Sequence, residues 1–284
     1  MKPATAKKIL VLALTLLLTV FMLAAEVEAA KKKKKKKKGK KTPKAEVTAT
    51  TQKETGSGLA QASAAVREAN RHLNAYDTDA AELALDGLSD TDAWTVTARG
   101  RIREQNQDYD AAVSELRRAA DIDTRNPAPV LFLGDSYAYS NRRGQANDAY
   151  AQAEVRARAL LEAESDDPDA LYYLGVAQQR QKRFDAAIVT LEKARSERPS
   201  DASILYQLGA TRFYQDQFQS AFDLLSRTID KNSGIAYAYY YRGLAAGKLE
   251  RKDILFNDLD RFVKMAPNAP EANTARQILA SFGG

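Results

Sequence analysis

The chain has 284 residues, a net charge of +6 and no cysteine. Without cysteine it can form no disulfide framework, thiol nucleophile, cysteine-based metal site or lipidated cysteine anchor. The charge is unevenly divided, because residues 1–44 hold fourteen lysines against two glutamates, a net +12, which leaves −6 for the remainder. The basic character therefore belongs to the amino-terminal segment, and no specific nucleic-acid groove is predicted in the rest of the chain.

The amino-terminal segment combines positive charge with an apolar stretch. Lys7 and Lys8 precede a run without charge over residues 9–25, and Val27-Glu28-Ala29 follows as a small-residue cleavage motif. This order is typical of a secretory signal peptide, so residues 1–29 are predicted to be one, with the protein exported, periplasmic or secreted. The lysines that follow oppose translocation, so a single-span membrane anchor is the alternative.

Residues 30–58 are rich in lysine and poor in apolar side chains. Such a composition is typical of a disordered segment. The segment is either a soluble spacer or a tether that contacts anionic lipid, surface polysaccharide or another polyanion. The lysines that would make the polyanion contact are Lys31, Lys32, Lys33, Lys34, Lys35, Lys36, Lys37, Lys38, Lys40, Lys41 and Lys44.

Glycines recur in register through the remainder of the chain. They are Gly100, Gly134, Gly175, Gly209 and Gly243, separated by 34, 41, 34 and 34 residues. Self-similarity at such a period is the signature of a repeat architecture. A glycine inside a helix costs about 1 kcal/mol relative to alanine, so its recurrence predicts that two helices approach each other closely there, with Ala187 opposite Gly175.

The clearest unit, residues 168–201, has apolar residues at helical spacing in both halves, a polar break between them and a proline at its end, which predicts a helix–turn–helix hairpin. Its patterned residues are Leu171, Leu174, Gly175, Ala187, Leu191, Ala194 and Pro199. They resemble the tetratricopeptide repeat (TPR) family. The resemblance implies an all-α fold, a right-handed TPR-type solenoid of antiparallel helix pairs. In the last unit Arg242, Leu255 and Phe262 depart from the family pattern.

The register divides the chain into units. Five TPR units are predicted at 93–126, 127–167, 168–201, 202–235 and 236–269, with a degenerate TPR-like unit at 59–92 and a C-terminal capping helix at 270–282. A terminal helix of this kind covers the apolar face that the last unit would otherwise expose. The second unit has seven additional residues, which extend its second helix by about two turns.

In the TPR family, positions 2, 5, 9, 12 and 13 of the first helices line a concave groove that binds a protein or peptide partner. The resemblance therefore implies partner-binding roles for Leu131, Tyr139, Tyr172, Val176, Tyr206, Phe213, Tyr237 and Tyr240. Tyrosine recurs at position 5 of three consecutive units, where the rings either form a binding wall or pack between neighbouring helices. The lysines, arginines and asparagines that clamp a ligand carboxylate in some family members are largely missing, so an apolar or aromatic-anchored segment is the expected ligand.

Features of an enzyme are missing from the sequence. It has no glycine-rich phosphate loop, metal-ligand spacing or Ser/His/Asp arrangement, and its single histidine, His72, is expected on a solvent-facing helix surface. We therefore expect no catalysis, cofactor or metal, but a protein–protein interaction scaffold in the cell envelope. The alternatives are a polyanion- or membrane-surface-binding protein that acts through Lys31–Lys44, and an accessory subunit of an enzyme complex.

Overall fold

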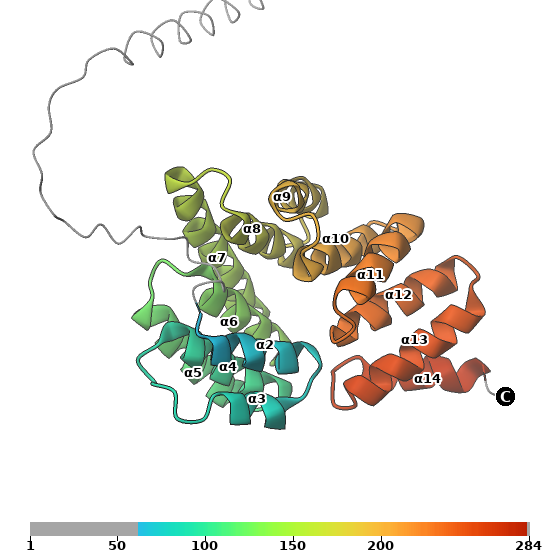
Figure 1. The fold of residues 1–284 in the computed structure, drawn as a ribbon, viewed down its shortest axis with the longest axis horizontal. Helices are drawn as coiled ribbons and strands as arrows, with labels where there is room; N and C mark the ends of the chain where they lie inside the picture. The colour runs from blue at the N-terminus through green and yellow to red at the C-terminus, as the bar shows by residue number, and fades with distance from the viewer. Residues whose placement is uncertain (1–61, 283–284) are drawn as a thin grey trace, which may run out of the picture. The chain divides into compact units, whose positions relative to one another are not determined.

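The computed structural model describes residues 62–282, which form thirteen helices, α2 to α14, and no strand within that range. The helices stack as antiparallel pairs, which confirms the predicted all-α TPR-type solenoid (Figure 1). The predicted signal peptide or anchor at 1–29 and the lysine-rich segment at 30–58 lie outside the described residues. None of the helices in the described range has the length and apolarity to span a membrane.

Each pair consists of a first and a second helix. The first helices are α2 (Ala64–Asn74), α4 (Ala93–Gln105), α6 (Pro127–Tyr139), α8 (Pro168–Arg180), α10 (Ala202–Tyr214) and α12 (Ala236–Lys248). The second helices are α3 (Thr78–Ala84), α5 (Tyr109–Ile122), α7 (Arg143–Ala163), α9 (Phe184–Glu197), α11 (Phe218–Lys231) and α13 (Lys252–Met265). The final helix, α14 (Ala272–Phe282), packs against α13. Helix α7 has 21 residues where α5 has 14, so it contains the seven additional residues of its unit.

The helix ends follow local chemistry. Asp92, Asn126, Asp167 and Asp201 precede α4, α6, α8 and α10, and each side chain accepts a hydrogen bond from a backbone N–H of the first turn. A residue in the left-handed backbone region, with φ between 57° and 63°, joins the first helix of each pair to the second. This conformation closes the first helix and reverses the chain within a few residues. The six residues are Tyr76, Gln107, Asn141, Lys182, Asp216 and Glu250.

The recurrent glycines make room for a large side chain of the second helix. A Cβ added at Gly175 would lie 2.6 Å from Leu191 Cγ, and at Gly134 it would lie 2.4 Å from Tyr150 Cε1. The predicted close approach is present, but the partner of Gly175 is Leu191 and not Ala187, whose carbonyl oxygen is 3.5 Å away. The large residue fills the helix crossing, and glycine is the side chain that leaves it space.

The last unit departs from the family pattern in a compensated way. Arg242 forms a two-pronged ion pair with Asp258, Nε to Oδ2 at 2.7 Å and Nη2 to Oδ1 at 2.8 Å. The added Cβ of Gly243 would lie 3.1 Å from Asp258 Cβ, a looser contact than at Gly175. Leu255 and Phe262 are buried and pack in one cluster with α12 and α14 residues. Leu255 and Phe262 thus replace small residues of the other units, and Arg242 of the ion pair with Asp258 stands where most of the other units have a leucine.

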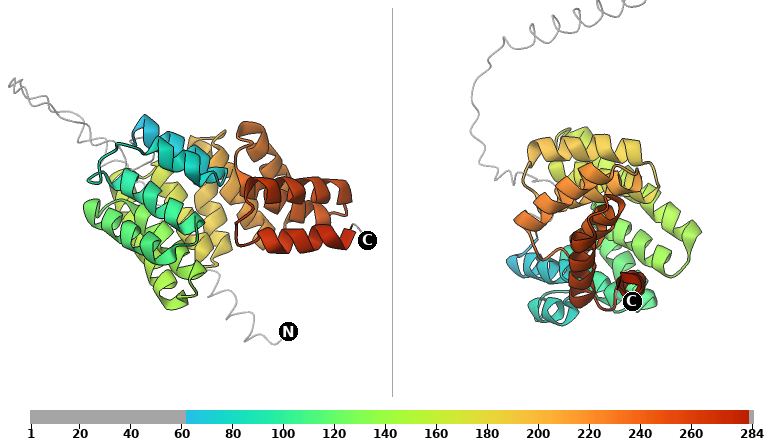
Figure 2. Two further views of the ribbon diagram at one scale, coloured as in Figure 1. Left: turned by 90° about the horizontal axis from the view of Figure 1, so that it is seen from below. Right: turned by 90° about the vertical axis from the view of Figure 1, so that its right-hand side faces the viewer.

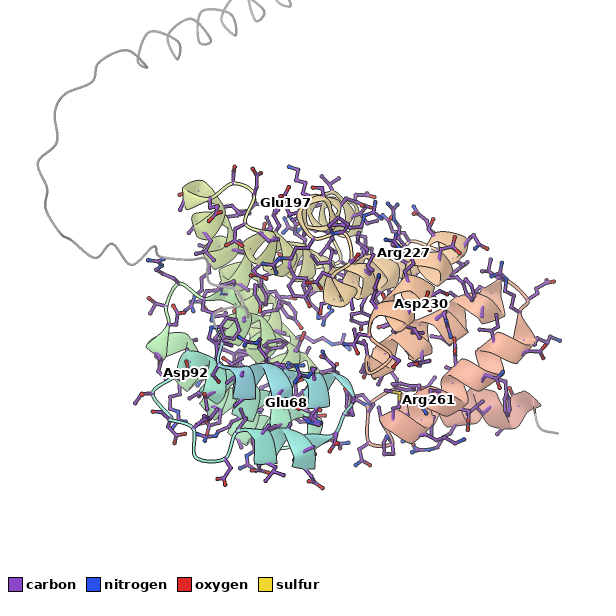
Figure 3. The ribbon with its side chains drawn as sticks, viewed as in Figure 1. Glu68, Asp92, Glu197, Arg227, Asp230 and Arg261 are labelled. Carbon is purple, nitrogen blue, oxygen red and sulfur yellow. The ribbon has the colours of Figure 1, made fainter. Side chains whose placement is uncertain are left out.

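The stack curves until its two ends meet. The Tyr76 hydroxyl donates to the Tyr237 hydroxyl at 3.3 Å, and Gln107 Nε2 donates to the carbonyl oxygen of Asn268 at 3.0 Å. Each contact joins residues 161 positions apart in sequence, and we call these four residues the seam. The first helix pair and the carboxyl-terminal helices lie side by side in Figures 1 and 2. Charged side chains such as Glu197 and Arg227 lie on the outside (Figure 3).

Candidate functional site

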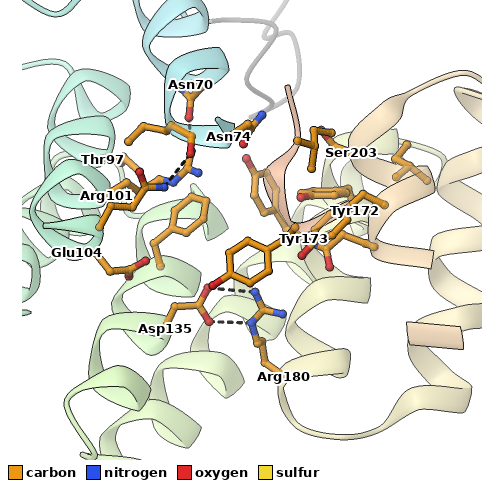
Figure 4. A pocket seen from close by; sticks show the side chains of 18 of the residues that line it. Asn70, Asn74, Thr97, Arg101, Glu104, Asp135, Tyr172, Tyr173, Arg180 and Ser203 are labelled. Carbon is orange, nitrogen blue, oxygen red and sulfur yellow. Dashed lines mark hydrogen bonds and ion pairs between the residues drawn. The ribbon is translucent and has the colours of Figure 1, made fainter. Parts of the chain in front are cut away.

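The first helices of all six pairs line a cavity of about 630 Å³ on the inside of the curve. Tyr150 of α7, Glu271 next to α14 and residues at helix ends, Tyr76, Arg198, Asp201 and Ile235, complete the lining. No residue of α7 beyond Tyr150 is among the described residues that line it, so the extension of α7 does not cover the cavity. Its volume is typical of ligand pockets. Figure 4 shows polar and aromatic side chains pointing into this space from several helices.

Four of the eight residues predicted to bind a partner line the cavity: Tyr139, Tyr172, Tyr206 and Tyr237. The other four, Leu131, Val176, Phe213 and Tyr240, do not. Leu131 and Val176 are each 2% exposed and belong to the core. Neighbouring helices enclose Leu131, Val176 and Tyr240, whereas Phe213 is half-buried, with its ring centroid 5.6 Å from those of Phe218 and Tyr241.

The recurrent tyrosines at position 5 have divided roles. Tyr172 and Tyr206 are half-buried and line the cavity, whereas Tyr240 is buried with its ring centroid 4.8 Å from that of Phe262. Burial raises the pKa of the Tyr172 and Tyr206 hydroxyls above the ordinary tyrosine value. Both hydroxyls therefore stay protonated at neutral pH and can donate hydrogen bonds into the cavity.

One side of the cavity, the aromatic wall, consists of Tyr206, Tyr214, Tyr237 and Tyr241 from α10 and α12. The ring of Tyr241 lies 6.3 Å from Tyr206, 5.7 Å from Tyr214 and 6.2 Å from Tyr237, measured between centroids. The hydroxyls of Tyr214 and Tyr241 are 2.5 Å apart, and the Tyr237 hydroxyl donates to the Glu271 carboxylate. Such contiguous rings offer rigid apolar area with hydrogen-bonding tips.

The polar wall has charged side chains where the aromatic wall has rings. It consists of Arg101, Glu104, Asp135 and Arg180 from α4, α6 and α8. Arg180 contacts Asp135 through Nε to Oδ1 at 2.7 Å and Nη2 to Oδ2 at 3.3 Å (Figure 4). The Tyr150 hydroxyl donates to the same Oδ1 at 2.9 Å. This paired geometry is among the stronger hydrogen-bonded ion pairs and holds three helices in register.

Glu104 and Arg101 are the remaining charged groups of the polar wall. Burial raises the pKa of Glu104 to about 8, the charge of Asp135 adds to the increase, and the Ser136 hydroxyl, which donates to Glu104 Oε2 at 2.7 Å, opposes it. Arg101 donates to the Asn70 side chain, and its Cζ lies 4.6 Å from the centroid of the Phe132 ring. Glu104 therefore changes charge close to neutral pH.

Several lining residues were missed at the level of sequence. Glu104 and Arg180 occupy positions 12 and 13 of their first helices, so the family register contained the signal for both. Tyr76 and Glu271 lie outside the five clear units, where no register was available. An apolar or aromatic-anchored ligand, as expected from the sequence, matches the chemistry of the aromatic wall but not that of the polar wall.

Neither His72 nor a cluster of metal-ligating side chains forms a second candidate site within residues 62–282. The His72 side chain is 34% exposed, and its ring nitrogens lie 3.7 Å from the carboxylates of Glu68 and Asp77. Among residues 62–282, no group of three or more histidine, aspartate, glutamate or cysteine side chains could hold a metal ion.

Comparison with known proteins gives one family match and one curated relative. Residues 146–228 match the family model described as anaphase-promoting complex, cyclosome, subunit 3. The BBSome complex member BBS4 of Bos taurus is 25% identical over 184 residues, which cover 65% of this chain and 34% of that protein. The chain thus spans about a third of the length of this relative.

Three solved structures with a similar arrangement of helices have low sequence identity to this chain. YrrB, a TPR protein with an unusual peptide-binding site, is 18% identical, with 66% of this chain and 93% of YrrB covered and a TM-score of 0.38. The Cut9–Hcn1 hetero-tetramer of APC/C is 16% identical, with 74% of this chain and 48% of that chain covered and a TM-score of 0.41. MamA from Desulfovibrio magneticus RS-1 is 18% identical, with 63% of this chain and 95% of that chain covered and a TM-score of 0.36.

The helix pairs and their glycine register give the chain the fold of a tetratricopeptide repeat solenoid, and residues 146–228 of this solenoid carry the family match. TPR proteins are typically non-catalytic scaffolds that bind protein or peptide partners.

Proposed function

We propose that the protein is a non-catalytic scaffold that holds a segment of a partner protein between the polar wall and the aromatic wall. The observation that carries this proposal is the composition of the cavity, which nine of the thirteen tyrosines of the chain line. Tyrosine provides contact area at little conformational cost and a hydroxyl for a backbone group of the ligand. The segment is bound in extended form or as a short helix.

The polar groups of the cavity support binding over catalysis. Asp135 is engaged by Arg180 and Tyr150, so it is not placed beside a free nucleophile. Ser136 donates to Glu104, but it is 0% exposed and no substrate can reach its hydroxyl. A nucleophile must contact both its base and the substrate, and this pair does not.

Photo-cross-linking in cells tests the proposal. A benzophenone amino acid is placed at Tyr206, which lines the cavity, or at Val189, which is 59% exposed on the outer helix α9. The full chain is expressed in its native cells and irradiated. We expect discrete cross-linked partners from position 206 and none of the same bands from position 189. Equal patterns from both positions, or no adduct at 206, would contradict the proposal.

We further propose that the scaffold works in the cell envelope, on the basis of the apolar run at residues 9–25 and the small-residue motif that follows. The intact mass of the protein in fractionated cells tests this. A mass that lacks about the first 29 residues, in a soluble envelope fraction, supports export. A full-length mass in the membrane fraction would favour an anchor, and a full-length cytoplasmic protein would contradict the envelope location.

The second candidate function is polyanion binding through Lys31–Lys44, which the net +12 of residues 1–44 favours. Binding of this kind weakens steeply as salt rises and is lost when residues 31–44 are deleted. Binding in the cavity instead survives that deletion and fails when Tyr172 and Tyr206 are both replaced by alanine. The two variants, compared at low and high salt, therefore separate the two functions.

A further inference from the structure

The end of α4 presents a buried hydrogen-bond acceptor to the cavity that the protein does not use. Gln105 Nε2 donates to the carbonyl oxygen of Leu73 at 2.8 Å, which fixes the orientation of the side-chain amide. The other amide atom, Oε1, is buried and has no hydrogen-bond partner among the described residues. Buried acceptors in folded proteins are nearly always paired. An unpaired one in the wall of a cavity indicates a ligand that donates to it.

Glu104, the preceding residue, has unused capacity as well. Its Oε2 accepts from Ser136, but no lysine or arginine of the described range lies within ion-pair distance of the carboxylate. The other lining acids are engaged in other ways, because Asp135 pairs with Arg180, Asp169 pairs with Arg198, Asp201 accepts from the backbone at the start of α10, and Glu271 accepts from Tyr237. Glu104 is the lining acid that directly precedes Gln105 with its unpaired Oε1, and the Oε1 of Glu104 is available to a ligand.

Aromatic rings lie around these two acceptors. Tyr76, Phe132 and Tyr139 line the same cavity, and Phe132 already stacks with the Arg101 guanidinium at 4.6 Å. Tyr139 stacks with Tyr109 at 6.2 Å between ring centroids and is 41% exposed, so part of its ring is open to a ligand. A ring face attracts a cation that is placed over it. The unpaired Gln105 Oε1, the remaining oxygen of Glu104 and the exposed ring area together match a positively charged group that carries several N–H donors.

We propose that the end of α4 binds a lysine or arginine side chain of the partner segment, with Glu104 and Gln105 as its acceptors and the rings of Tyr76 and Tyr139 beside it. This inference rests on the proposed function, since it names the chemistry of the segment that the cavity holds. It also explains why the polar wall keeps an acid that has no cationic partner of its own.

Proton release accompanies this binding. The charged and titratable groups that interact with Glu104 are Arg101 on α4, Tyr109 on α5, Asp135 and Tyr139 on α6, Tyr150 on α7, Arg180 on α8 and Tyr76 after α2. Burial and the Asp135 charge raise the pKa of Glu104 to about 8, so the empty cavity holds the carboxyl largely protonated at neutral pH. A cation binds the ionised form, so the affinity increases about tenfold from about pH 7 to about pH 9.

The test uses the single tryptophan of the chain, Trp94, which lines the cavity and reports binding by its fluorescence. The probes are two acetylated and amidated peptides, Ala-Leu-Arg-Leu-Ala and the same peptide with citrulline, which has the shape of arginine without its charge. The full chain is titrated with each near pH 8.5, and again as Glu104→Gln. Glu162→Gln, on the exposed face of α7, is the matched control.

We expect the arginine peptide to bind at least about tenfold more tightly than the citrulline peptide, because a charge-assisted hydrogen bond exceeds a neutral one by about that factor. Glu104→Gln should remove the preference and its pH dependence, Gln105→Met should weaken it, and Glu162→Gln should leave it unchanged. Equal binding of both peptides, an unaltered preference in Glu104→Gln, or no fluorescence response to either peptide would overturn the inference. The cross-linking from position 206 judges the scaffold function independently of these results.

Discussion

The polar wall and the aromatic wall enclose one cavity but are stabilised in different ways. In the polar wall, Asp135 and Arg180 pair through two hydrogen bonds, and Arg180 is the cation in ion-pair contact with Asp135. In the aromatic wall, the Tyr241 ring contacts several other rings at once. We infer that the polar wall is sensitive to single substitutions, whereas the aromatic wall is redundant and tolerates conservative ones.

The largest expected effect comes from Arg180→Met, which leaves the Asp135 carboxylate, 8% exposed as a residue, without its cation. Removing one partner of a buried pair costs roughly 3–5 kcal/mol, and since the Arg180 side chain is 33% exposed we expect the lower end, about 3 kcal/mol. Urea unfolding measures the change. The control is Arg158→Met, because the Arg158 side chain that pairs with Glu154 is 55% exposed. A similar loss of unfolding free energy in both variants would contradict the account.

Gly134, the register glycine of the second unit, leaves space for the Tyr150 ring, whose hydroxyl donates to Asp135 of the polar wall. Gly134→Ala would place a Cβ 2.4 Å from the Tyr150 ring and displace the hydroxyl that donates to Asp135. Overpacking of this kind costs about 1–3 kcal/mol, of which helix propensity offsets about 1 kcal/mol. Gly243→Ala, in the unit of the aromatic wall, meets its nearest atom at 3.1 Å and should be nearly neutral in the same unfolding experiment. Equal costs would refute the packing argument.

The raised pKa of Glu104 makes stability depend on pH. The carboxyl binds its proton more tightly in the folded state, with a pKa of about 8 against an ordinary value of 4.5. Its contribution is therefore fully present below about pH 4.5 and is lost as the pH rises through about 8. Glu104→Gln should lose less free energy of unfolding between about pH 5 and pH 9 than the wild type, by at least about 1 kcal/mol. Parallel profiles for the two proteins would show that the carboxyl is not buried.

The smallest effects are expected in the aromatic wall. Tyr237→Phe removes a hydroxyl that donates to Glu271 and accepts from Tyr76, so it should cost about 1 kcal/mol. Tyr206→Phe keeps the ring at the cavity and should change the free energy of unfolding by less than about 0.5 kcal/mol. Thermal unfolding compares the two. A Tyr206→Phe cost that matches the Arg180→Met cost would remove the distinction between the walls.

The repeat pattern was sufficient to predict the fold. Regular glycines and apolar spacing indicate helix pairs because each unit repeats the same local chemistry and contacts mainly its neighbours. The partners of the glycines were harder to predict, since the close contact of Gly175 is made by a leucine sixteen residues later and not by the nearer alanine.

The cavity could be predicted only in part. Tyr139, Tyr172, Tyr206 and Tyr237 follow from the family register, but Leu131 is enclosed by neighbouring helices and does not reach the surface. The closure of the stack depends on small rotations summed over every unit, which no local motif encodes. The seam residues Tyr76 and Gln107 share a left-handed turn conformation with four residues that make no such contact, so their role emerges only in three dimensions.

The central claim is that the stack closes on itself, so that both walls face one cavity. The chain contains no cysteine, so a pair introduced at Gln107 and Asn268, whose side-chain nitrogen and carbonyl oxygen are 3.0 Å apart, is unique. A pair at Gln107 and Val189 serves as the control. The folded protein is treated with a short bismaleimide, because a contact through a long glutamine side chain does not set two Cβ atoms at disulfide distance, and intact mass measures the cross-link. We predict rapid, nearly complete cross-linking between positions 107 and 268 and none between 107 and 189. If the 107–268 pair is not cross-linked under the same conditions, the solenoid is open and the account is wrong.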